Sequence, residues 1–282
     1  MMSINEFWKS FKGNKMGLVG LGIIIFFILM AILAPYVSPY NPNQTNPNLF
    51  LTPPSSKHIF GTNEIGQDLF SRNLYGAQIS LEVGFAAAAV TVFLGLLIGL
   101  ISGYFGGIID EILMRITDFF LVIPSIVFMI IISAFLGPSL LNVIFVIGLL
   151  SWSPTARVVR SMVLSIREWP FVEAAKANNA GHFYIMFRHI MPNVIPIVFA
   201  NATMAISNAI FSQAALVFLG VGDVNDISWG NIMHFALYSG AISAGDWWYI
   251  VPPGIFIILL ILGFILLGYS LEEIFNPRLR RV

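Results

Sequence analysis

An uncharged stretch in the middle of the chain limits its fold more than any other feature. It covers residues 119–156, which contain no Lys, Arg, Asp or Glu. A hydrocarbon core about 30 Å thick requires about 20 apolar residues of helix, so this stretch is too long for one span and long enough for two. The run Gly137-Pro138-Ser139 supplies a turn between them. With 57% hydrophobic and 10% charged residues, the chain belongs in a bilayer.

Six predominantly apolar windows are predicted to span the membrane, at 16–36, 81–103, 112–136, 139–155, 193–220 and 248–270. We therefore expect an all-α, polytopic membrane protein. The predicted organisation is an interfacial helix at 1–15, a first span at 16–36, an extracytoplasmic segment at 37–80, a five-helix core at 81–270 with a cytoplasmic loop at 157–192, and a tail at 271–282.

The distribution of basic residues predicts the orientation. An even number of spans places both termini on one side, and a cytoplasmic N-terminus leaves only Lys57 and Arg72 of the fourteen basic residues outside. Because cytoplasmic loops are rich in Lys and Arg, both termini of this multi-pass cell-membrane protein are predicted to be cytoplasmic. The formal net charge of zero offers no attraction to nucleic acid.

Two segments of the chain are predicted to lie outside the spans, one on the membrane surface and one on the outer side. Apolar residues recur at helical spacing between lysines near the N-terminus, at Ile4, Phe7, Trp8 and Phe11, which predicts a short helix in contact with membrane lipid. The outer segment 38–57 is rich in Pro and Asn, so we expect it to be extended and without regular structure.

The largest predicted cytoplasmic loop, 157–192, begins with a short helix. Pro170 suits the first turn of a helix, and Glu173 lies near its positive end. Ala174 and Ala175 are strong helix formers.

The end of this helix and the residues after it leave two questions open. Asn179 or Gly181 ends the helix, because both tolerate the left-handed conformation. A second short helix at 182–191 is rich in Phe, Ile and Met. Because the loop has few charges, its apolar surface must be covered. Either a partner protein or the ends of this chain's own spans could cover it.

These residues carry a resemblance to a known family. The run Glu173-Ala174-Ala175, with Gly181, Arg188-His189-Ile190-Met191-Pro192 and Asn193, resembles the EAA loop of binding-protein-dependent ABC importer permeases, in the C-type branch of dipeptide, oligopeptide and nickel systems. Further segments resemble the same branch in the expected order: Phe60 to Asp68, Ser71-Arg72, Leu74 to Ala77, Gly103 to Gly107, Asp110, Met114-Arg115, Asp118, Pro124 and Asn276 to Arg280. The chain departs from the family pattern at Asn179, where Gly is usual, and at Asn63, Gln67 and Gln78, where charged residues are usual.

The resemblance implies the type I permease fold of ABC importers and a division of labour among subunits. The expected partners are a second, similar permease, two cytoplasmic ATPase subunits that bind ATP and Mg, and an extracytoplasmic solute-binding protein. The implied coupling residues, which transmit ATP-driven closure, are Glu173, Ala174, Ala175, Asn179, Gly181 and Arg188. The chain has no Gly-x-x-x-x-Gly-Lys-Ser/Thr phosphate loop, so ATP hydrolysis is expected in another polypeptide and no cofactor or catalytic residue in this one.

The resemblance also implies a substrate class. Short peptides are the commonest substrates of this branch, and oligosaccharides or nickel chelates are the alternatives. The expected mechanism is alternating access. A secondary transporter or channel is the competing class, but the predicted spans lack the mid-membrane carboxylates that such a carrier would use.

Polar side chains on the fifth predicted span indicate a translocation path. Asn201, Asn208 and Ser212 share one helix face, and Ser207 and Gln213 lie beside it. Five hydrogen-bonding side chains in three turns exceed what packing requires, so a hydrated path is favoured over hydrogen bonds between helices.

Three further clusters have structural interpretations. Glu111, Arg115 and Asp118 share a helix face and are predicted to form an ion cluster, with a proton relay as the alternative. Glycines recur every fourth residue at Gly95, Gly99 and Gly103, which predicts close helix packing, with a moving contact as the alternative. The four histidines are too sparse for a metal site. The outer loop 221–247 either touches a delivery protein or forms an aromatic belt.

Overall fold

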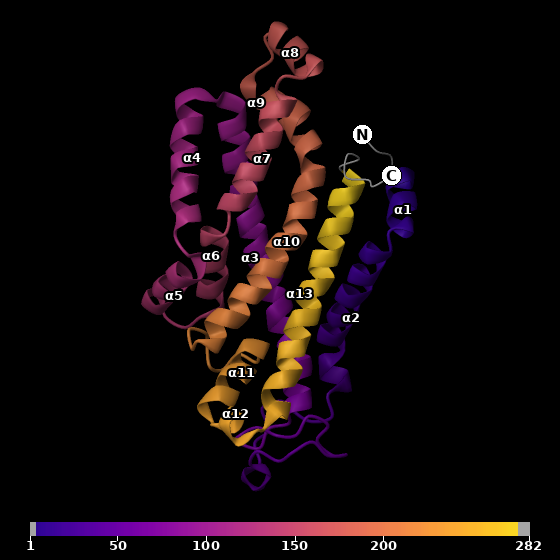
Figure 1. The fold of residues 1–282 in the computed structure, drawn as a ribbon, viewed down its shortest axis with the longest axis vertical. Coiled ribbons are helices and arrows are strands. Elements are labelled where there is room, and N and C mark those ends of the chain that lie inside the picture. Colours follow the sequence, from indigo (N-terminus) through magenta and orange to yellow (C-terminus); the bar gives the residue numbers. More distant parts are fainter. Residues whose placement is uncertain (1–3, 276–282) are drawn as a thin grey trace.

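The uncharged stretches fold into helices, because a backbone in hydrocarbon must satisfy its own hydrogen bonds. A computed structural model describes residues 4–275 of the chain (Figure 1). It contains five helical segments long and apolar enough to cross a membrane, and a sixth if a bent pair is counted as one span. Apart from one isolated bridge between Thr62 and Asp68, the described residues form no β-structure. The predicted all-α, polytopic fold is confirmed.

Most helices follow one another with short connections, and the long irregular segment 38–68 is the exception. In chain order they are α1 (Ile4–Gly13), α2 (Lys15–Val37), the short 3-10 helix η1 (Pro47–Leu49), α3 (Leu69–Phe105), α4 (Gly107–Val122), α5 (Ser125–Leu136), α6 (Leu140–Leu150), α7 (Ser153–Ile166), α8 (Pro170–Ala177), α9 (His182–Tyr184), the π-helical turn η2 (Ile185–Ile190), α10 (Met191–Phe218), α11 (Trp229–Tyr238), α12 (Ala241–Ala244) and α13 (Trp247–Phe275).

Figure 1 shows which parts of the chain meet at each end of the bundle. Helix α8 projects from one end, and α1 and the end of α13 lie at that same end. The irregular segment before α3 lies at the opposite end with α11 and α12. We call these the α8 end and the loop end. The predicted tail motif Asn276 to Arg280 and the basic Arg281 lie outside the described residues.

One predicted span, 112–136, is two helices rather than one. Helices α4 and α5 meet at an angle of 89° around Ile123 and Pro124. Proline lacks a backbone N–H and drives the preceding residue out of the helical region, and Ile123 is extended with ψ of 129°. The angle follows from Pro124, which sequence reasoning had used only as part of a family pattern.

Two helices extend beyond their predicted spans because local signals outweigh hydropathy. Helix α3 begins at Leu69 rather than at residue 81, since the Asp68 carboxylate caps its first turn by accepting from the Ser71 N–H at 2.7 Å. Helix α7 continues the fourth span to Ile166 although it carries several arginines. Helices α11 and α12 occupy a segment that was expected to be a loop.

The glycine stripe on α3 brings that helix into direct contact with α7. A Cβ at Gly95 would lie 2.6 Å from Cβ of Thr155, and one at Gly99 would lie 2.6 Å from the Ala156 carbonyl oxygen. At Gly103 a Cβ would meet Val163 at 2.7 Å. Only glycine permits this approach, so the predicted packing role of the stripe is confirmed.

The remaining spans pack around α13 and at the two ends. Helix α13 lies along both α2 and α10. At the loop end the buried Trp229 of α11 donates its indole N–H to the Asn73 carbonyl of α3 at 2.9 Å. At the α8 end the rings of Phe7 and Phe275 stack, and Phe11 is buried, so α1 is attached to the end of α13.

The predicted ion cluster on α4 is wrong in its partners. Asp118 pairs with Arg157 of α7, and Asp110, which was not assigned to the cluster, pairs with Arg160 of α7. Glu111 and Arg115 form no ion pair within residues 4–275. Helical spacing alone overlooked the neighbouring helix, whose arginines supply the opposite charges.

The glycine stripe predicts a position-specific effect on stability. We expect Gly99→Ala to lower the midpoint of thermal unfolding in detergent, because a Cβ there overlaps the α7 backbone and overpacking destabilises by about 1–3 kcal/mol. Gly22→Ala in α2 is the matched control, since a Cβ there meets no atom within 4 Å and alanine favours a helix by about 1 kcal/mol. Equal midpoints for the two variants would contradict the close contact.

Candidate functional site

Helix α8 forms the tip of the molecule and packs against it through two apolar side chains, Val172 and Ala175. Pro170 opens the helix after Trp169, which is extended. Val172 is fully buried in a core cluster formed by the adjoining ends of α3, α7, η2 and α10. Every other residue of α8 except Ala175 is exposed. One face of a short helix is therefore fixed and the rest is presented to the surroundings.

The end of α8 is a Schellman motif built on asparagine. Asn179 has φ of +54°, and its N–H donates to the Lys176 carbonyl at 3.0 Å. The N–H of Ala180 donates to the Ala175 carbonyl at 3.1 Å, which completes the motif. Gly181 has an ordinary φ of −63° and precedes α9. Of the two residues predicted to end the helix, Asn179 is the one that does so.

The next two short elements divide their side chains between a core and the surface. Ile185, Met186 and Ile190 of η2 are buried in the same cluster as Val172. Five aromatic side chains around α8 and α9 remain exposed, and we call them the tip aromatics: Trp169, Phe171, Phe183, Tyr184 and Phe187. The chain's own spans therefore cover one side of the loop, as one of the two interpretations predicted. The tip aromatics stay exposed, as at many interaction sites, and their cover by a partner stays a prediction.

The two charged residues predicted to act in coupling lie within this exposed surface. Neither the Glu173 carboxylate nor the Arg188 guanidinium forms a hydrogen bond or ion pair with residues 4–275. Glu173 lies in the first turn of α8, where the helix dipole favours a negative charge. Both groups are free to meet a partner.

The tip is linked to the ends of two long helices. The ring Nδ1 of His182 lies 2.9 Å from the hydroxyl of Tyr104, near the end of α3. The Lys176 ammonium donates to the Arg167 carbonyl at 3.4 Å, just after α7. These contacts join α8 and α9 to α3 and α7.

The predicted path residues of α10 separate into two groups. Asn208 is exposed and its amide has no hydrogen-bond partner among the described residues, while Asn201 and Ser212 are half-buried nearby on the same face. Ser207 and Gln213 are buried. The Ser207 hydroxyl donates to its own helix and, at 3.4 Å, to the Ile261 carbonyl of α13. Three of the five residues thus lie on an open face, and two face the interior of the chain.

Gln213 faces a small cavity at the loop end rather than the open face. The cavity measures about 10 Å³, the space of one water molecule, and Asp226 and Asn231 also line it. Partial burial, together with the neighbouring carboxylates of Asp223 and Glu82, raises the pKa of Asp226 above its usual range. The Asn231 side chain donates to the backbone carbonyls of Asp223 and Asp226, so this region fastens the α10–α11 loop.

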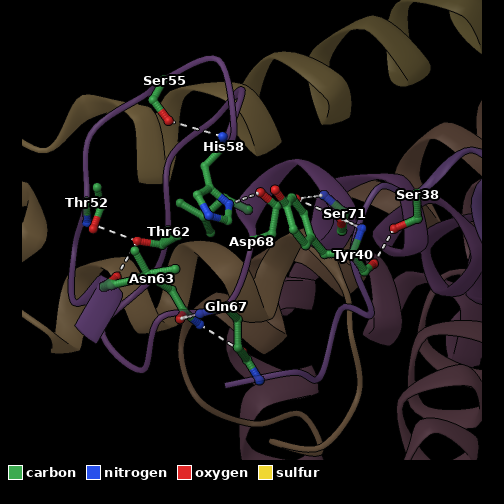
Figure 2. Close-up of polar contacts among 12 residues, drawn as sticks. Ser38, Tyr40, Thr52, Ser55, His58, Thr62, Asn63, Gln67, Asp68 and Ser71 are labelled. Atoms are coloured by element: carbon green, nitrogen blue, oxygen red, sulfur yellow. Dashed lines mark hydrogen bonds and ion pairs between the residues drawn. The ribbon is translucent and has the colours of Figure 1, made fainter. Parts of the chain in front are cut away.

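The segment before α3 has irregular backbone, as its composition predicted, but it is fixed by buried polar side chains (Figure 2). His58 Nδ1 lies 2.8 Å from Asp68 Oδ1, and the Tyr40 ring stacks on the imidazole. The second carboxylate oxygen of Asp68 accepts from both the N–H and the hydroxyl of Ser71 at 2.7 Å. Sequence reasoning treated His58 as isolated, because its partner lies ten positions away across a loop.

The residues that depart from the family pattern form internal contacts. The Asn63 amide donates to Gln67 Oε1 at 2.8 Å, and both side chains are buried (Figure 2). Gln78 donates to the Ala31 carbonyl of α2 at 2.8 Å. Arg72, predicted as an outer charge, is buried and donates to the Pro42 carbonyl at 3.0 Å. The described residues contain no group of three or more His, Cys, Asp or Glu placed to hold a metal ion.

The Schellman motif predicts opposite effects for two substitutions. We expect Asn179→Gly to leave amide protection of α8 unchanged or raised, because glycine adopts positive φ without strain. Asn179→Val places a β-branched residue at φ of +54° and is expected to destabilise the end of α8 by about 1–2 kcal/mol. Hydrogen exchange of the amides of residues 172–180 measures both effects.

Gly181→Ser is the control for this pair. Its φ is ordinary, a Cβ there meets no atom within 4 Å, and serine is a favoured residue at a helix start. Protection equal to that of the native chain is expected. Equal protection in Asn179→Val would mean that α8 does not depend on this motif.

Comparison with known proteins assigns the family. Residues 95–281 match the model for binding-protein-dependent transport system inner membrane components, and residues 4–54 match the N-terminal transmembrane domain of oligopeptide transport permease C. The chain is 40% identical to the dipeptide transport system permease protein DppC of Alkalihalophilus pseudofirmus, over 98% of this chain and 90% of the relative. It is 36% identical to the oligopeptide transport system permease protein OppC of Bacillus subtilis, over 97% and 90% respectively.

A further relative agrees with these two. The chain is 36% identical to the dipeptide transport system permease protein DppC of Bacillus subtilis, over 97% of this chain and 85% of the relative. The resemblance to C-type permeases is thus confirmed along nearly the whole chain. The chain belongs to the family of inner-membrane components of binding-protein-dependent transport systems.

Proposed function

We propose that this chain is a permease subunit of an ATP-driven importer that moves short peptides across the cell membrane by alternating access. The observation that carries the proposal is α8: a short, capped helix fixed by the buried Val172 and surrounded by exposed aromatic side chains at one end of an apolar bundle. The dipeptide and oligopeptide permeases that it resembles support peptides as the substrate class. Oligosaccharides and nickel chelates are the alternatives that the same importer type serves.

The α8 end is the proposed docking site for two cytoplasmic ATPase subunits, one on this chain and one on a second permease. The tip aromatics supply apolar contact area, and Glu173 and Arg188 supply charges without partners among residues 4–275. Closure of the ATPase pair upon ATP binding pushes α8, and the movement passes to the spans. ATP and Mg belong to those subunits, and this chain carries out no covalent chemistry.

The open face of α10 is the proposed wall of the translocation path. An amide such as that of Asn208 is unfavourable in lipid hydrocarbon, so this face requires water or protein against it. A second, similar permease on the other side of the path would supply both. Amides in the path would hydrogen-bond peptide groups without selecting side chains.

The loop end is the proposed receiving side for an extracytoplasmic solute-binding protein. Its irregular segment is held rigid by the His58, Asp68 and Ser71 contacts and is tied to α13 by the hydrogen bond from Tyr249 to Glu64. With this end outside, the α8 end and both chain termini lie in the cytoplasm, which agrees with the charge distribution.

Two measurements test the proposed function. The chain, tagged in its native cell, is purified gently, and co-purifying proteins and small molecules are identified by mass spectrometry; an ATPase, a sibling permease and a loaded binding protein are expected. The recovered complex is then placed in proteoliposomes with ATP inside and a labelled dipeptide outside. Recovery of the chain alone, under conditions that preserve other complexes, would restore the carrier alternative.

Charge reversal at Glu173 tests the docking site. We expect Glu173→Lys to reduce ATP-driven uptake at least about tenfold, the effect of losing about 1.4 kcal/mol of coupling, while the chain still folds and reaches the membrane. Glu111→Lys is the matched control, because this exposed acid belongs to α4 and not to α8, so the variant should keep most of the uptake. Native uptake by a normally assembled Glu173→Lys complex would contradict the role of this residue.

Removal of the amide at Asn208 tests the path. We expect Asn208→Leu to lower the rate of peptide uptake severalfold without lowering the unfolding temperature, because the side chain has no hydrogen-bond partner among the residues that the structure describes. Phe199→Leu is the control and should leave uptake close to native, because this exposed side chain lies nine positions before Asn208 and therefore on the opposite side of the helix. Unchanged uptake by Asn208→Leu would remove this residue from the path.

A further inference from the structure

Helix α4 is the least firmly packed of the long helices at the α8 end. Thr117 is its only buried residue. It is joined to α3 through Gly106 and Gly107, both with positive φ, at +66° and +53°. A Cβ at Gly107 would meet no atom within 4 Å. Apolar packing alone therefore leaves α4 free to pivot about this glycine joint.

Two arginines, Arg160 of α7 and Arg167 directly after it, bind the α3–α4 turn on either side of the joint. Arg160 donates from Nε and Nη2 to the two carboxylate oxygens of Asp110, both at 2.5 Å. Arg167 donates to the Gly103 carbonyl of α3 at 3.1 Å. We call Arg160 and Arg167 the arginine clasp. A two-point guanidinium–carboxylate contact restrains direction as well as distance, which a single hydrogen bond does not.

The arginine clasp is close to α8 in the sequence. Helix α7 ends at Ile166, and α8 begins at Pro170. Ile166 and Val163 of α7 share a buried cluster with Val172 of α8 and with Leu100 of α3. The glycine stripe holds α7 against α3 above the same cluster. A displacement of α8 must therefore carry α7 and the end of α3 with it.

We propose that Arg160 and Asp110 are positioning residues that make α4 follow α7 and α8, so that force applied at α8 reaches the bent pair α4–α5. Without the pair, the glycine joint absorbs the movement and α4 stays behind. ATP hydrolysis then continues while transport falls. This inference rests on the proposed function for its transport readout, but the movement of α4 is measurable independently.

A second ion pair between the same two helices provides a matched control. Asp118 of α4 accepts from Arg157 of α7, but through one nitrogen only. The side chains of Arg157 and Asp118 are 55% and 43% exposed, against 32% and 14% for Arg160 and Asp110. Exposed single-contact pairs contribute little, because water screens them. Loss of the Asp118 charge should therefore leave coupling nearly native.

The first test measures peptides transported per ATP hydrolysed by the assembled complex in proteoliposomes. We expect Asp110→Asn to lower this ratio about tenfold with ATPase activity within about twofold of native, and Asp118→Asn to leave it unchanged. Arg160→Lys, which retains the charge but loses the two-point contact, should show an intermediate loss. The double charge exchange Asp110→Arg with Arg160→Asp should recover part of the ratio. A native ratio in both Asp110→Asn and Arg160→Lys would overturn the proposal.

The second test follows α4 directly and does not depend on the substrate. The chain has no cysteine, so Phe119→Cys near the far end of α4 and Ser165→Cys on α7 provide two spin-label sites in it, both exposed. In the complex, double electron–electron resonance should give one narrow distance in the nucleotide-free and ATP-bound states. The same labels with Asp110→Asn should give a broad distribution in at least one state.

The outcomes separate the two proposals. A narrow distance in both states with Asp110→Asn would overturn the positioning role, whatever the complex transports. Absence of peptide uptake by the native complex, with α4 still following α7 only when Asp110 is present, would overturn the proposed substrate and leave the positioning role intact.

Discussion

The contact between α3 and α7 is the constraint on which the α8 end depends. It is possible only because glycine occupies the three positions where a Cβ would overlap Thr155, Ala156 or Val163. In lipid the hydrophobic effect does not favour helix–helix contact, because lipid tails are as apolar as the side chains. The attraction between α3 and α7 must therefore come from close backbone approach and dense packing. Once α7 is held in this way, its arginines lie within reach of the α3–α4 turn, and its last apolar residues lie where Val172 inserts.

The two ends of the bundle are stabilised by different means. At the loop end, a segment with almost no regular structure is fixed by short polar side chains that bond to one another and to the first turn of α3. At the α8 end, backbone capping at Asn179 and the buried Val172 fix a helix whose Glu173 carboxylate has no partner among residues 4–275. The polar groups of the loop end are thus hydrogen-bonded within the chain, whereas Glu173 at the α8 end can still bind a partner.

Hydropathy and the special residues predicted much of this fold, because each acts locally. The spans follow from charge-free length, the α3–α7 contact from glycine spacing, and the end of α8 from the small set of residues that tolerate positive φ. The failures involve partners from other helices. Asp118 was assigned to neighbours on its own helix, yet its partner is Arg157 of α7. Ser207 and Gln213 were placed beside the path, yet the packing of α13 and α11 buries them.

The arrangement of charges on α4 and α7 has a consequence for how a force could pass through the molecule. A purely apolar contact between two helices in lipid resists separation but not sliding, because one hydrocarbon surface exchanges for another at little cost. A two-point ion pair resists both, since either movement breaks hydrogen bonds to charged groups in a partly buried site. Asp110 of this pair lies three residues after Gly107, in a helix with one buried residue, Thr117. The ion pair therefore restrains α4 next to the glycine joint, where the flexible backbone alone does not.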